Sequence, residues 1–274
     1  MQINHNVRAM VTQHSLYQNN NALGKSLEKL STGLRINRAQ DDAAGLAMSE
    51  QMRGQIRGLG KAKQNAQDGI AALQIAEGGL AEISNIMQRQ RELAVQGAND
   101  TLTTTERTYI KNEIDQLADE IDRINKTTDY NSIKMLSDFG NLSSPRTLHI
   151  GPSSLGSNVV AISYDATTLA ISMKSVTELN HMNFEKTLGS IEGSLKSVNS
   201  IRATIGTFIN RMEYTVNNIA NLEFNTQDAE SRIRDTDFAK ETTSFTRNQI
   251  MVQSATSMLA QANSLPQSVL GLLG

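Results

Sequence analysis

The stretch LGSIEGSLKSVNSIRATIGTFINRMEYTVNNI, residues 188–219, repeats apolar residues at alternating steps of three and four, with one polar exception at Arg202. This spacing lines the apolar side chains along one stripe of a helix and is typical of a coiled-coil seam. At about 1.5 Å per residue it predicts a helix of roughly 45 Å or more. Arg202 either sets the register of the packed helices or reaches out of the seam to solvent. The residues predicted to pack along this seam in a helical bundle are Leu188, Ile191, Leu195, Val198, Ile205, Ile209 and Met212.

Similar seams occur in other segments of the chain. Two lie in its first half, at 73–87 and 110–124. The seam near the N-terminus consists of Leu16, Leu23, Leu27 and Leu30. The seam near the C-terminus runs through Met251, Met258, Leu265, Val269 and Leu272, with Ala255 and Ala262 between them. Together these five seams predict five helices.

Turn-forming residues interrupt the helical pattern at two places. The first is the polar segment 99–105, where Thr104 or Thr105 is expected to cap a helix that opens at Glu106. The second, 137–156, is rich in Gly, Pro, Asn and Ser. Short strands are predicted within and after it by β-branched runs at 147–150, 158–164 and 168–173. The sequence therefore predicts a small β-containing insert between two helical halves.

The composition suits long helices better than a compact globular core. Aromatic residues make up 4% of the 274 residues and Trp is absent, although aromatic side chains usually supply much of a globular core. Only three prolines occur and none precedes Pro145, so proline breaks no helix in the first half. A net charge of −2 gives no sign of a nucleic-acid or anionic-membrane partner. Cysteine is absent, which excludes disulfides and thiolate chemistry.

The two ends of the chain are almost uncharged. No side chain from Asn248 to Gly274 is charged, and the only formal charge before Lys25 is Arg8. These stretches are too polar to span a bilayer, yet they lack the charged face of a solvated helix. We therefore expect them to be buried against other protein, which copies of the same chain can supply. Open association of identical subunits gives helical filaments.

No residue pattern indicates a catalytic, cofactor or metal site, so the chain is predicted not to be an enzyme. The four histidines have no metal-ligand spacing, and the loop 151–157 lacks the lysine of a phosphate-binding loop. Two carboxylate pairs are expected to form salt bridges at helix ends rather than to act as acid and base. They are Asp41 and Asp42 beside Arg35 and Arg38, and Asp235 and Asp237 beside Arg232 and Arg234. The sequence shows neither a secretory signal peptide nor an apolar run that predicts a membrane span.

Ordered sequence blocks at both ends resemble those of a known family. The N-terminal blocks are EKLSTGLRINR at 28–38, DDAAGLA at 41–47 and QRQRELAVQ at 88–96, and the C-terminal blocks are AESRIRD at 229–235 and MLAQAN at 258–263. They resemble the terminal regions of bacterial flagellins, and the resemblance covers nearly everything except about residues 140–182. Many flagellins carry large outer domains in mid-chain. Here only about forty residues separate the helical halves, so a short form is expected.

The resemblance implies a mainly α fold, with long coiled-coil helices in a rod-like bundle, paired N- and C-terminal helices and a small β-hairpin insert. It implies an inner filament-core domain made of 1–44 with 235–274. It also implies an outer helical bundle made of 45–140 with 182–234, to which 141–181 adds a small β-containing segment. The seam residues of the two terminal segments are then expected to pack in the filament core.

The resemblance further implies a structural subunit that polymerises into the flagellar filament for swimming and leaves the cell unfolded through the flagellar type III apparatus. The implied partners are copies of itself, an export chaperone that binds the C-terminal region, and the filament cap and hook–filament junction proteins. No cofactor, nucleic acid or membrane is among them. The expected location is the secreted, extracellular filament, or the periplasm if the chain is of the spirochaete type.

The resemblance also implies recognition by the flagellin-sensing Toll-like receptor of hosts. The matching positions are Arg89, Leu93 and Glu113. Arg89 and Leu93 lie about one helical turn apart and are expected to share a face. Alternatively, Leu93 packs in the bundle while the charged residues are simply solvated.

Other interpretations of the sequence give different expectations. A hook–filament junction protein would share the terminal helices, and so would a periplasmic filament protein of the spirochaete type. A soluble coiled-coil adaptor would keep both terminal helices folded in dilute monomer. A hydrolase would need a nucleophile, a base and oxyanion donors brought together, and the sequence shows no such set.

Overall fold

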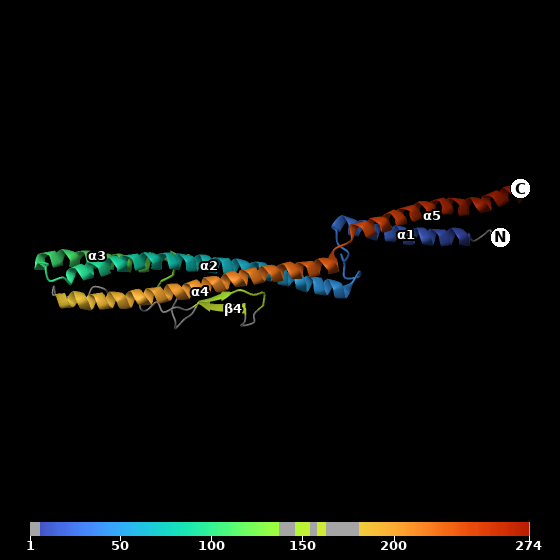
Figure 1. Cartoon of the computed structure of the whole chain (residues 1–274). Helices are drawn as coiled ribbons and strands as arrows, with labels where there is room; N and C mark the ends of the chain where they lie inside the picture. The colour runs from blue at the N-terminus through green and yellow to red at the C-terminus, as the bar shows by residue number, and fades with distance from the viewer. Residues whose placement is uncertain (1–5, 137–145, 154–157, 163–180, 274) are drawn as a thin grey trace. The chain divides into compact units, whose positions relative to one another are not determined.

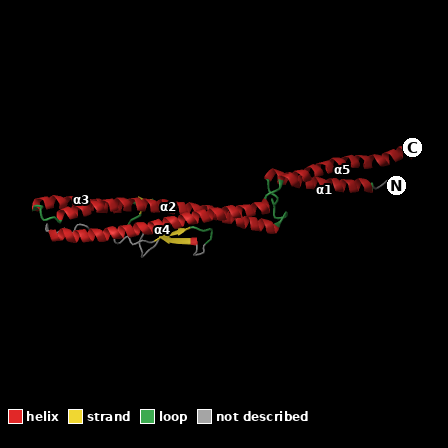
Figure 2. Cartoon of the chain, in the orientation of Figure 1, coloured by secondary structure: helices red, strands yellow, loops and turns green. Residues whose placement is uncertain are grey.

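A computed structural model describes residues 6–136, 146–153, 158–162 and 181–273, with the side chains of 183–264 in the last of these ranges. Helices dominate this part of the chain (Figure 2). The five helices of the described residues are α1 Val7–Thr32, α2 Ala43–Gly97, α3 Thr104–Thr127, α4 His181–Arg234 and α5 Phe238–Leu273. Helices α1 and α5 lie side by side (Figure 1). The predicted mainly α fold with paired terminal helices is thus confirmed.

The chain divides into two compact units. The terminal unit joins 1–54 to 225–274, and the bundle unit is 55–224. Helices α1 and α5 belong wholly to the terminal unit, whereas α2 and α4 contribute to both units. The divisions between these compact units fall inside α2 and α4, whereas the resemblance implied filament domains that meet near 44 and 235. The role of each unit in a filament stays a prediction.

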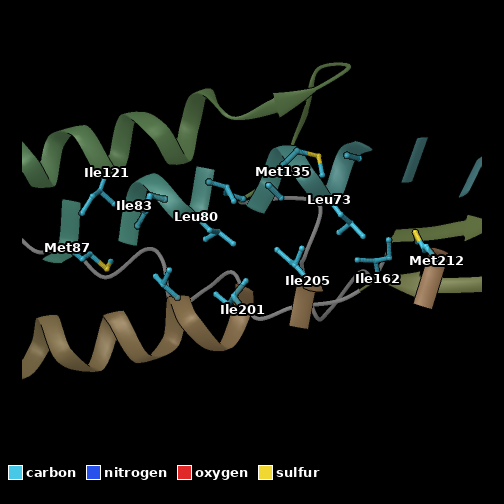
Figure 3. Close-up of a cluster of buried hydrophobic side chains, with 14 of the residues drawn as sticks. Leu73, Leu80, Ile83, Met87, Ile121, Met135, Ile162, Ile201, Ile205 and Met212 are labelled. Atoms are coloured by element: carbon cyan, nitrogen blue, oxygen red, sulfur yellow. The ribbon is translucent and has the colours of Figure 1, made fainter. Parts of the chain in front are cut away.

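The core of the bundle unit is formed by the apolar seams of α2, α3 and α4 (Figure 3). The predicted 73–87 seam of α2 lies at its centre, with Leu73, Leu80 and Ile83 fully buried. Residues that point into this cluster from the other helices and from the hairpins include Ile121, Met135, Ile162, Ile201, Ile205 and Met212. Side chains far apart in the sequence therefore share one hydrophobic core, and burying each is worth about 1.5–3 kcal/mol before entropy.

The predicted seam of α4 packs into the bundle unit with a seven-residue repeat, Ile191 in a smaller cluster and Val198, Ile205 and Met212 in this core. Ile191, Val198, Ile205 and Met212 are buried, whereas Leu188, Leu195 and Ile209 are half-buried at its edge. The residues of one heptad position therefore point into the bundle interior, and those of the other position lie at its edge, as in a coiled coil. Phe184 and Ile201 are also buried, although the 3–4 pattern did not mark them.

Arg202, the polar member of that seam, reaches across to α2. Its guanidinium pairs with the Glu77 carboxylate at 2.8 Å, and both side chains are partly exposed. The charge thus leaves the apolar core and meets a partner at its edge. Exposed pairs of this kind contribute only about 0–1 kcal/mol.

Two antiparallel hairpins pack beside the helices. Strand β1, Asp129–Tyr130, pairs with β2, Ile133–Lys134, and strand β3, Arg146–His149, pairs with β4, Val159–Ile162. The predicted strand 147–150 corresponds to β3 and the described part of the predicted strand 158–164 corresponds to β4, each starting one residue from its expected position. Residues 163–164 of the second prediction lie outside the described residues. The predicted strand 168–173 lies outside the described residues. The β1–β2 hairpin was not predicted, because two-residue strands give no alternating pattern.

Helix α3 begins at Thr104, before the expected opening at Glu106. Thr103, not Thr104 or Thr105, is its N-cap, and its hydroxyl accepts a hydrogen bond from the Glu106 amide. The Glu106 carboxylate in turn accepts the Thr103 amide at 2.8 Å. This reciprocal pair needs a spacing of three residues, which Thr103 and Glu106 have and the two predicted caps lack.

Candidate assembly interface

Helices α1 and α5 are held together in antiparallel directions by contacts at their ends. The Asn6 side chain accepts a hydrogen bond from the Ala9 amide at 3.1 Å and donates one to the Ala262 carbonyl at 2.8 Å. At the other end, Gly33 has a positive φ of 73° and closes α1 with a left-handed cap. The Gly33 carbonyl then accepts the Thr236 amide at 2.9 Å, just before α5 begins.

The segments that join α1 and α5 to α2 and α4 are also bonded to each other. Leu34 and Asp235 form an antiparallel bridge, and the Arg35 amide donates to the Arg234 carbonyl at 2.6 Å. The Arg35 guanidinium donates to the Ile233 carbonyl, which the end of α4 would otherwise leave free. Two connectors far apart in the sequence are therefore tied together by backbone contacts.

The carboxylate pairs near these connectors mostly bind backbone amides instead of the neighbouring arginines. Asp42 caps α2 through the Gly45 amide at 2.9 Å, and Asp237 caps α5 through the Ala239 amide at 2.9 Å. Asp41 accepts the Arg38 amide at 3.0 Å, and Asp235 accepts the Ser231 hydroxyl at 2.7 Å. The expectation of salt bridges with the adjacent arginines was therefore wrong. Backbone amides at the start of a helix have no partner within the helix, so they compete with arginines for nearby carboxylates. Here Asp42 and Asp237 accept hydrogen bonds from such amides.

The arginines of this region pair elsewhere. Arg38 binds Glu28 at 3.1 Å, Arg232 binds Asp228 at 2.7 Å, and Arg234 binds Glu50 at 2.7 Å. The Arg234 guanidinium, followed by that of Arg53, holds the pKa of the Glu50 carboxyl below its usual range. The amide of Arg38 lowers the pKa of Asp41 in the same direction. Both carboxylates are stabilised in their charged form by direct hydrogen bonds.

The contact between α1 and α5 is thin. Leu16, Leu23 and Leu30 are only half-buried on α1, and Val252 and Leu259 are half-buried on α5. Among the described residues, the buried hydrophobic side chains of the terminal unit are Ile36 and Ala262 alone. The bundle unit, by contrast, contains an extended buried core. The terminal unit therefore lacks a hydrophobic core of its own.

Three residues of the predicted terminal seams lie on the surface of the described chain. Leu27 is 56% exposed, Met251 49% and Met258 62%. Within one chain, Val252 and Leu259 are half-buried, whereas the predicted seam residues Met251 and Met258 are exposed, so the packing of these two methionines in a filament core stays a prediction. Both pairs are seven residues apart and both flank Ala255 and Ala262, so the 3–4 spacing fits either stripe. The side chains of Leu265, Val269 and Leu272 lie outside the described part of α5.

The exposed apolar side chains form open faces on both terminal helices. We define the open face of α5 as Phe238, Ile250, Met251 and Met258, and the open face of α1 as Val7, Met10 and Val11. Leu27 is exposed on another side of α1. A groove of about 740 Å³ runs along α5 from Phe238 to Met251, lined by one side of that helix. Most of these residues were missed in the sequence, although apolar residues outside the seam of an uncharged helix could have indicated them.

The three proposed receptor positions do not form one surface. Leu93 is 2% exposed and packs with Ile110, Ile114 and Phe184, so the expectation that it shares a face with Arg89 was wrong. Four residues rotate a helix by about 40°, and the edge of the buried stripe falls between the two positions. Arg89 is exposed and pairs with Glu113 at 3.0 Å. The guanidinium bonds to Glu92 and Glu113 raise the pKa of Arg89.

Within the described residues, no helix is long and apolar enough to cross a membrane. The same residues contain no group of three or more His, Asp or Glu side chains placed to hold a metal ion.

Long helices packed by heptad seams, with terminal helices that leave apolar side chains uncovered, define a class of α-helical structural proteins suited to association. Comparison with known proteins gives the family. Residues 3–140 match the bacterial flagellin N-terminal helical region and residues 188–273 match the bacterial flagellin C-terminal helical region, so the chain belongs to the bacterial flagellin family.

Full-length relatives agree with this family. A flagellin of Halalkalibacterium halodurans is 45% identical over 276 residues, which cover 100% of both chains. The flagellar filament 33 kDa core protein of Treponema phagedenis is 44% identical over 286 residues, again 100% of both chains. The solved structure of a proposed flagellar hook-associated protein from Vibrio parahaemolyticus has a TM-score of 0.59 at 13% identity, over 71% of this chain and 100% of that chain. This last likeness concerns the fold alone.

Proposed function

We propose that this chain, a structural subunit of a bacterial flagellar filament, polymerises when neighbouring copies cover the open faces of α1 and α5. The family is one of structural proteins, and the proposed role is structural without enzymatic activity. One observation carries the proposal. The terminal unit exposes large apolar side chains along two long helices and has almost no core of its own.

Simple energetics support assembly through these faces. Covering one Leu-, Ile- or Met-sized side chain stabilises by about 1.5–3 kcal/mol before entropy. The two open faces together present Val7, Met10, Val11, Phe238, Ile250, Met251 and Met258. Several such contacts per subunit are enough to order helices that a single chain packs poorly. We propose that the terminal unit forms the filament core and that the bundle unit forms the outer layer.

The test of this proposal is seeded polymerisation of purified full-length chain, followed by electron microscopy. Ile250→Glu places a charge on the open face of α5, and we expect it to block elongation. Gln67→Glu adds the same charge at an exposed polar position of the bundle unit, outside both terminal helices, and it should elongate normally. Normal filaments from Ile250→Glu, or from chain lacking 252–274, would refute the proposal.

The route and the final location follow from the same function. We propose unfolded export through the flagellar type III apparatus, with a chaperone on the C-terminal region and with filament cap and hook–filament junction proteins as assembly partners. Similarity to both a flagellin and a Treponema filament core protein supports either an extracellular or a periplasmic filament. Protease added to intact cells distinguishes them. An extracellular filament is digested, and a periplasmic one is digested only after the outer membrane is opened.

We propose receptor recognition through Arg89 and Glu113, without the buried Leu93. Arg89 and Glu113 are exposed and lie together on neighbouring helices, so a host Toll-like receptor could contact both at once. We expect Arg89→Ala to reduce receptor activation by the subunit, while Arg123→Ala, which removes another exposed arginine paired within its own helix, leaves it unchanged.

Leu93→Ala tests the alternative role of that residue. Because Leu93 is buried, we expect this change to lower the free energy of unfolding by about 2–5 kcal/mol. Arg89→Ala should lower it by less than about 1 kcal/mol, since its ion pairs are exposed. Equal receptor activation by Arg89→Ala and by the unchanged chain would contradict the proposed contact.

A further inference from the structure

The sulfur atoms of this chain are unevenly placed. The chain has no cysteine, so its 11 methionines carry all of its sulfur. Among the described side chains, the buried methionines Met87, Met135 and Met212 all belong to the bundle unit. The exposed ones are Met10 at 64%, Met48 at 50%, Met251 at 49% and Met258 at 62%, and all belong to the terminal unit.

Three of these four thioethers lie on the open faces through which the subunit is proposed to assemble. Met10 is on the open face of α1, and Met251 and Met258 are on that of α5. Met251 also lines the α5 groove with Phe238 and Ile250. A methionine side chain suits such a surface, because its flexible and polarisable thioether adapts to irregular apolar partners.

The same thioethers are open to oxidation in the free subunit. Hydrogen peroxide transfers one oxygen atom to the sulfur, which is oxidised by two electrons while the peroxide is reduced to water. The product, methionine sulfoxide, is polar and accepts hydrogen bonds. Burying a sulfoxide without a hydrogen-bond donor costs free energy. Because these positions are exposed in the free subunit and covered on assembly, oxidation weakens assembly and leaves the folded subunit unaffected.

The open face of α5 has few donors to offer a sulfoxide. The hydroxyls of Thr242, Thr243 and Thr246 line the groove, but each already donates to a backbone carbonyl of its own helix. Arg247 is the charged donor in the groove, and it lies four residues before Met251. A sulfoxide at Met251 therefore has a charged donor one turn away, and we expect Met10 and Met258 to be the more sensitive positions.

We infer that Met10, Met251 and Met258 form an oxidation-sensitive site on the assembly surface. Sulfoxide at these positions in the free subunit stops its addition to a filament, and incorporation into the filament shields the sulfurs. The inference rests on the proposed function, since it needs these faces to be covered by neighbouring copies. Its chemical agent is a two-electron oxidant of the peroxide class.

The experiment treats full-length subunit with hydrogen peroxide, maps oxidised methionines by peptide mass spectrometry and measures elongation from untreated seeds. We expect Met10, Met48, Met251 and Met258 to gain oxygen before Met87, Met135 and Met212. Elongation should then fall by at least about tenfold, since one unpartnered polar group per interface has that effect on an equilibrium constant. Methionine sulfoxide reductase should restore it. In preformed filaments, Met10, Met251 and Met258 should be oxidised more slowly than in the free subunit.

Matched variants separate this site from other damage. The triple variant Met10→Leu, Met251→Leu and Met258→Leu keeps the faces apolar, so we expect it to elongate both before and after peroxide. Met48→Leu removes an exposed methionine outside the two faces and should stay peroxide-sensitive. A triple variant as sensitive as the unchanged chain, or normal elongation by fully oxidised subunit, would overturn the inference and leave the proposed function standing. Normal elongation by Ile250→Glu would instead contradict the proposed function itself.

Discussion

Gly97, the last residue of α2, lies directly against the ring of Phe184 on α4. A Cβ atom at this position would be 2.6 Å from two ring carbons, and Phe184 is fully buried. We therefore expect Gly97→Ala to lower the free energy of unfolding by about 1–3 kcal/mol through overpacking.

The matched control is Gly78→Ala in the same helix. A Cβ at Gly78 meets nothing within 4 Å, so this change should raise the free energy of unfolding by about 0.5–1 kcal/mol, as Ala favours helix over Gly. Urea unfolding followed by circular dichroism measures both. If Gly97→Ala were as stabilising as Gly78→Ala, the close approach of Phe184 would be wrong.

Glu50 gives a prediction on pH dependence. Its pKa is lowered by the guanidinium of Arg234 first and of Arg53 second. A carboxyl with a lowered pKa stabilises the fold above its ordinary pKa, and this contribution is lost as pH falls through the folded value. We expect Arg234→Gln to raise the pKa of Glu50 toward the usual glutamate value. Arg53→Gln should raise it less, and Arg57→Gln should leave it unchanged. Carbon-13 NMR titration of the side-chain carboxyl measures all three.

At the scale of the helix, the start of α3 depends on one reciprocal pair. Thr103 and Glu106 each accept the other's backbone amide, and the helix begins at Thr104. We expect Thr103→Ala to lower the free energy of unfolding by about 0.5–2 kcal/mol. Thr105→Ala, at an exposed position in the first turn, should have little effect. A larger loss from Thr105→Ala than from Thr103→Ala would place the cap where the sequence alone suggested.

At the scale of the whole molecule, the two units should differ in stability. The bundle unit has an extended buried core, whereas the terminal unit has nearly none. We expect backbone amides of α1 and α5 to exchange hydrogen quickly in dilute subunit and those of the bundle core slowly. In filaments, exchange in α1 and α5 should slow strongly. Strong protection of both terminal helices in dilute subunit would instead favour the coiled-coil adaptor.

The parts of this fold that depend on local spacing could be predicted from the sequence. The α4 seam, the break before α3 and the strands β3 and β4 all follow from periodicity or turn chemistry in a short window. Contacts in which two possible partners compete for the same group could not be predicted from the sequence. Asp42 and Asp237 were expected to bind arginines, but the amides that begin α2 and α5 lie closer. Leu93 and Arg89 were expected to share a face, but the edge of the core separates them.

The sequence by itself determined that this chain forms long helices and carries uncharged, apolar-striped ends, because both properties are written in residue spacing and charge. It also carried the blocks that mark the flagellin family. Only the tertiary structure decided which stripe of α5 faces α1 and which stays open. The stripe through Met251 and Met258 and the stripe through Val252 and Leu259 are offset by one residue, and both satisfy the same periodicity. The choice between them depends on how closely α1 can approach.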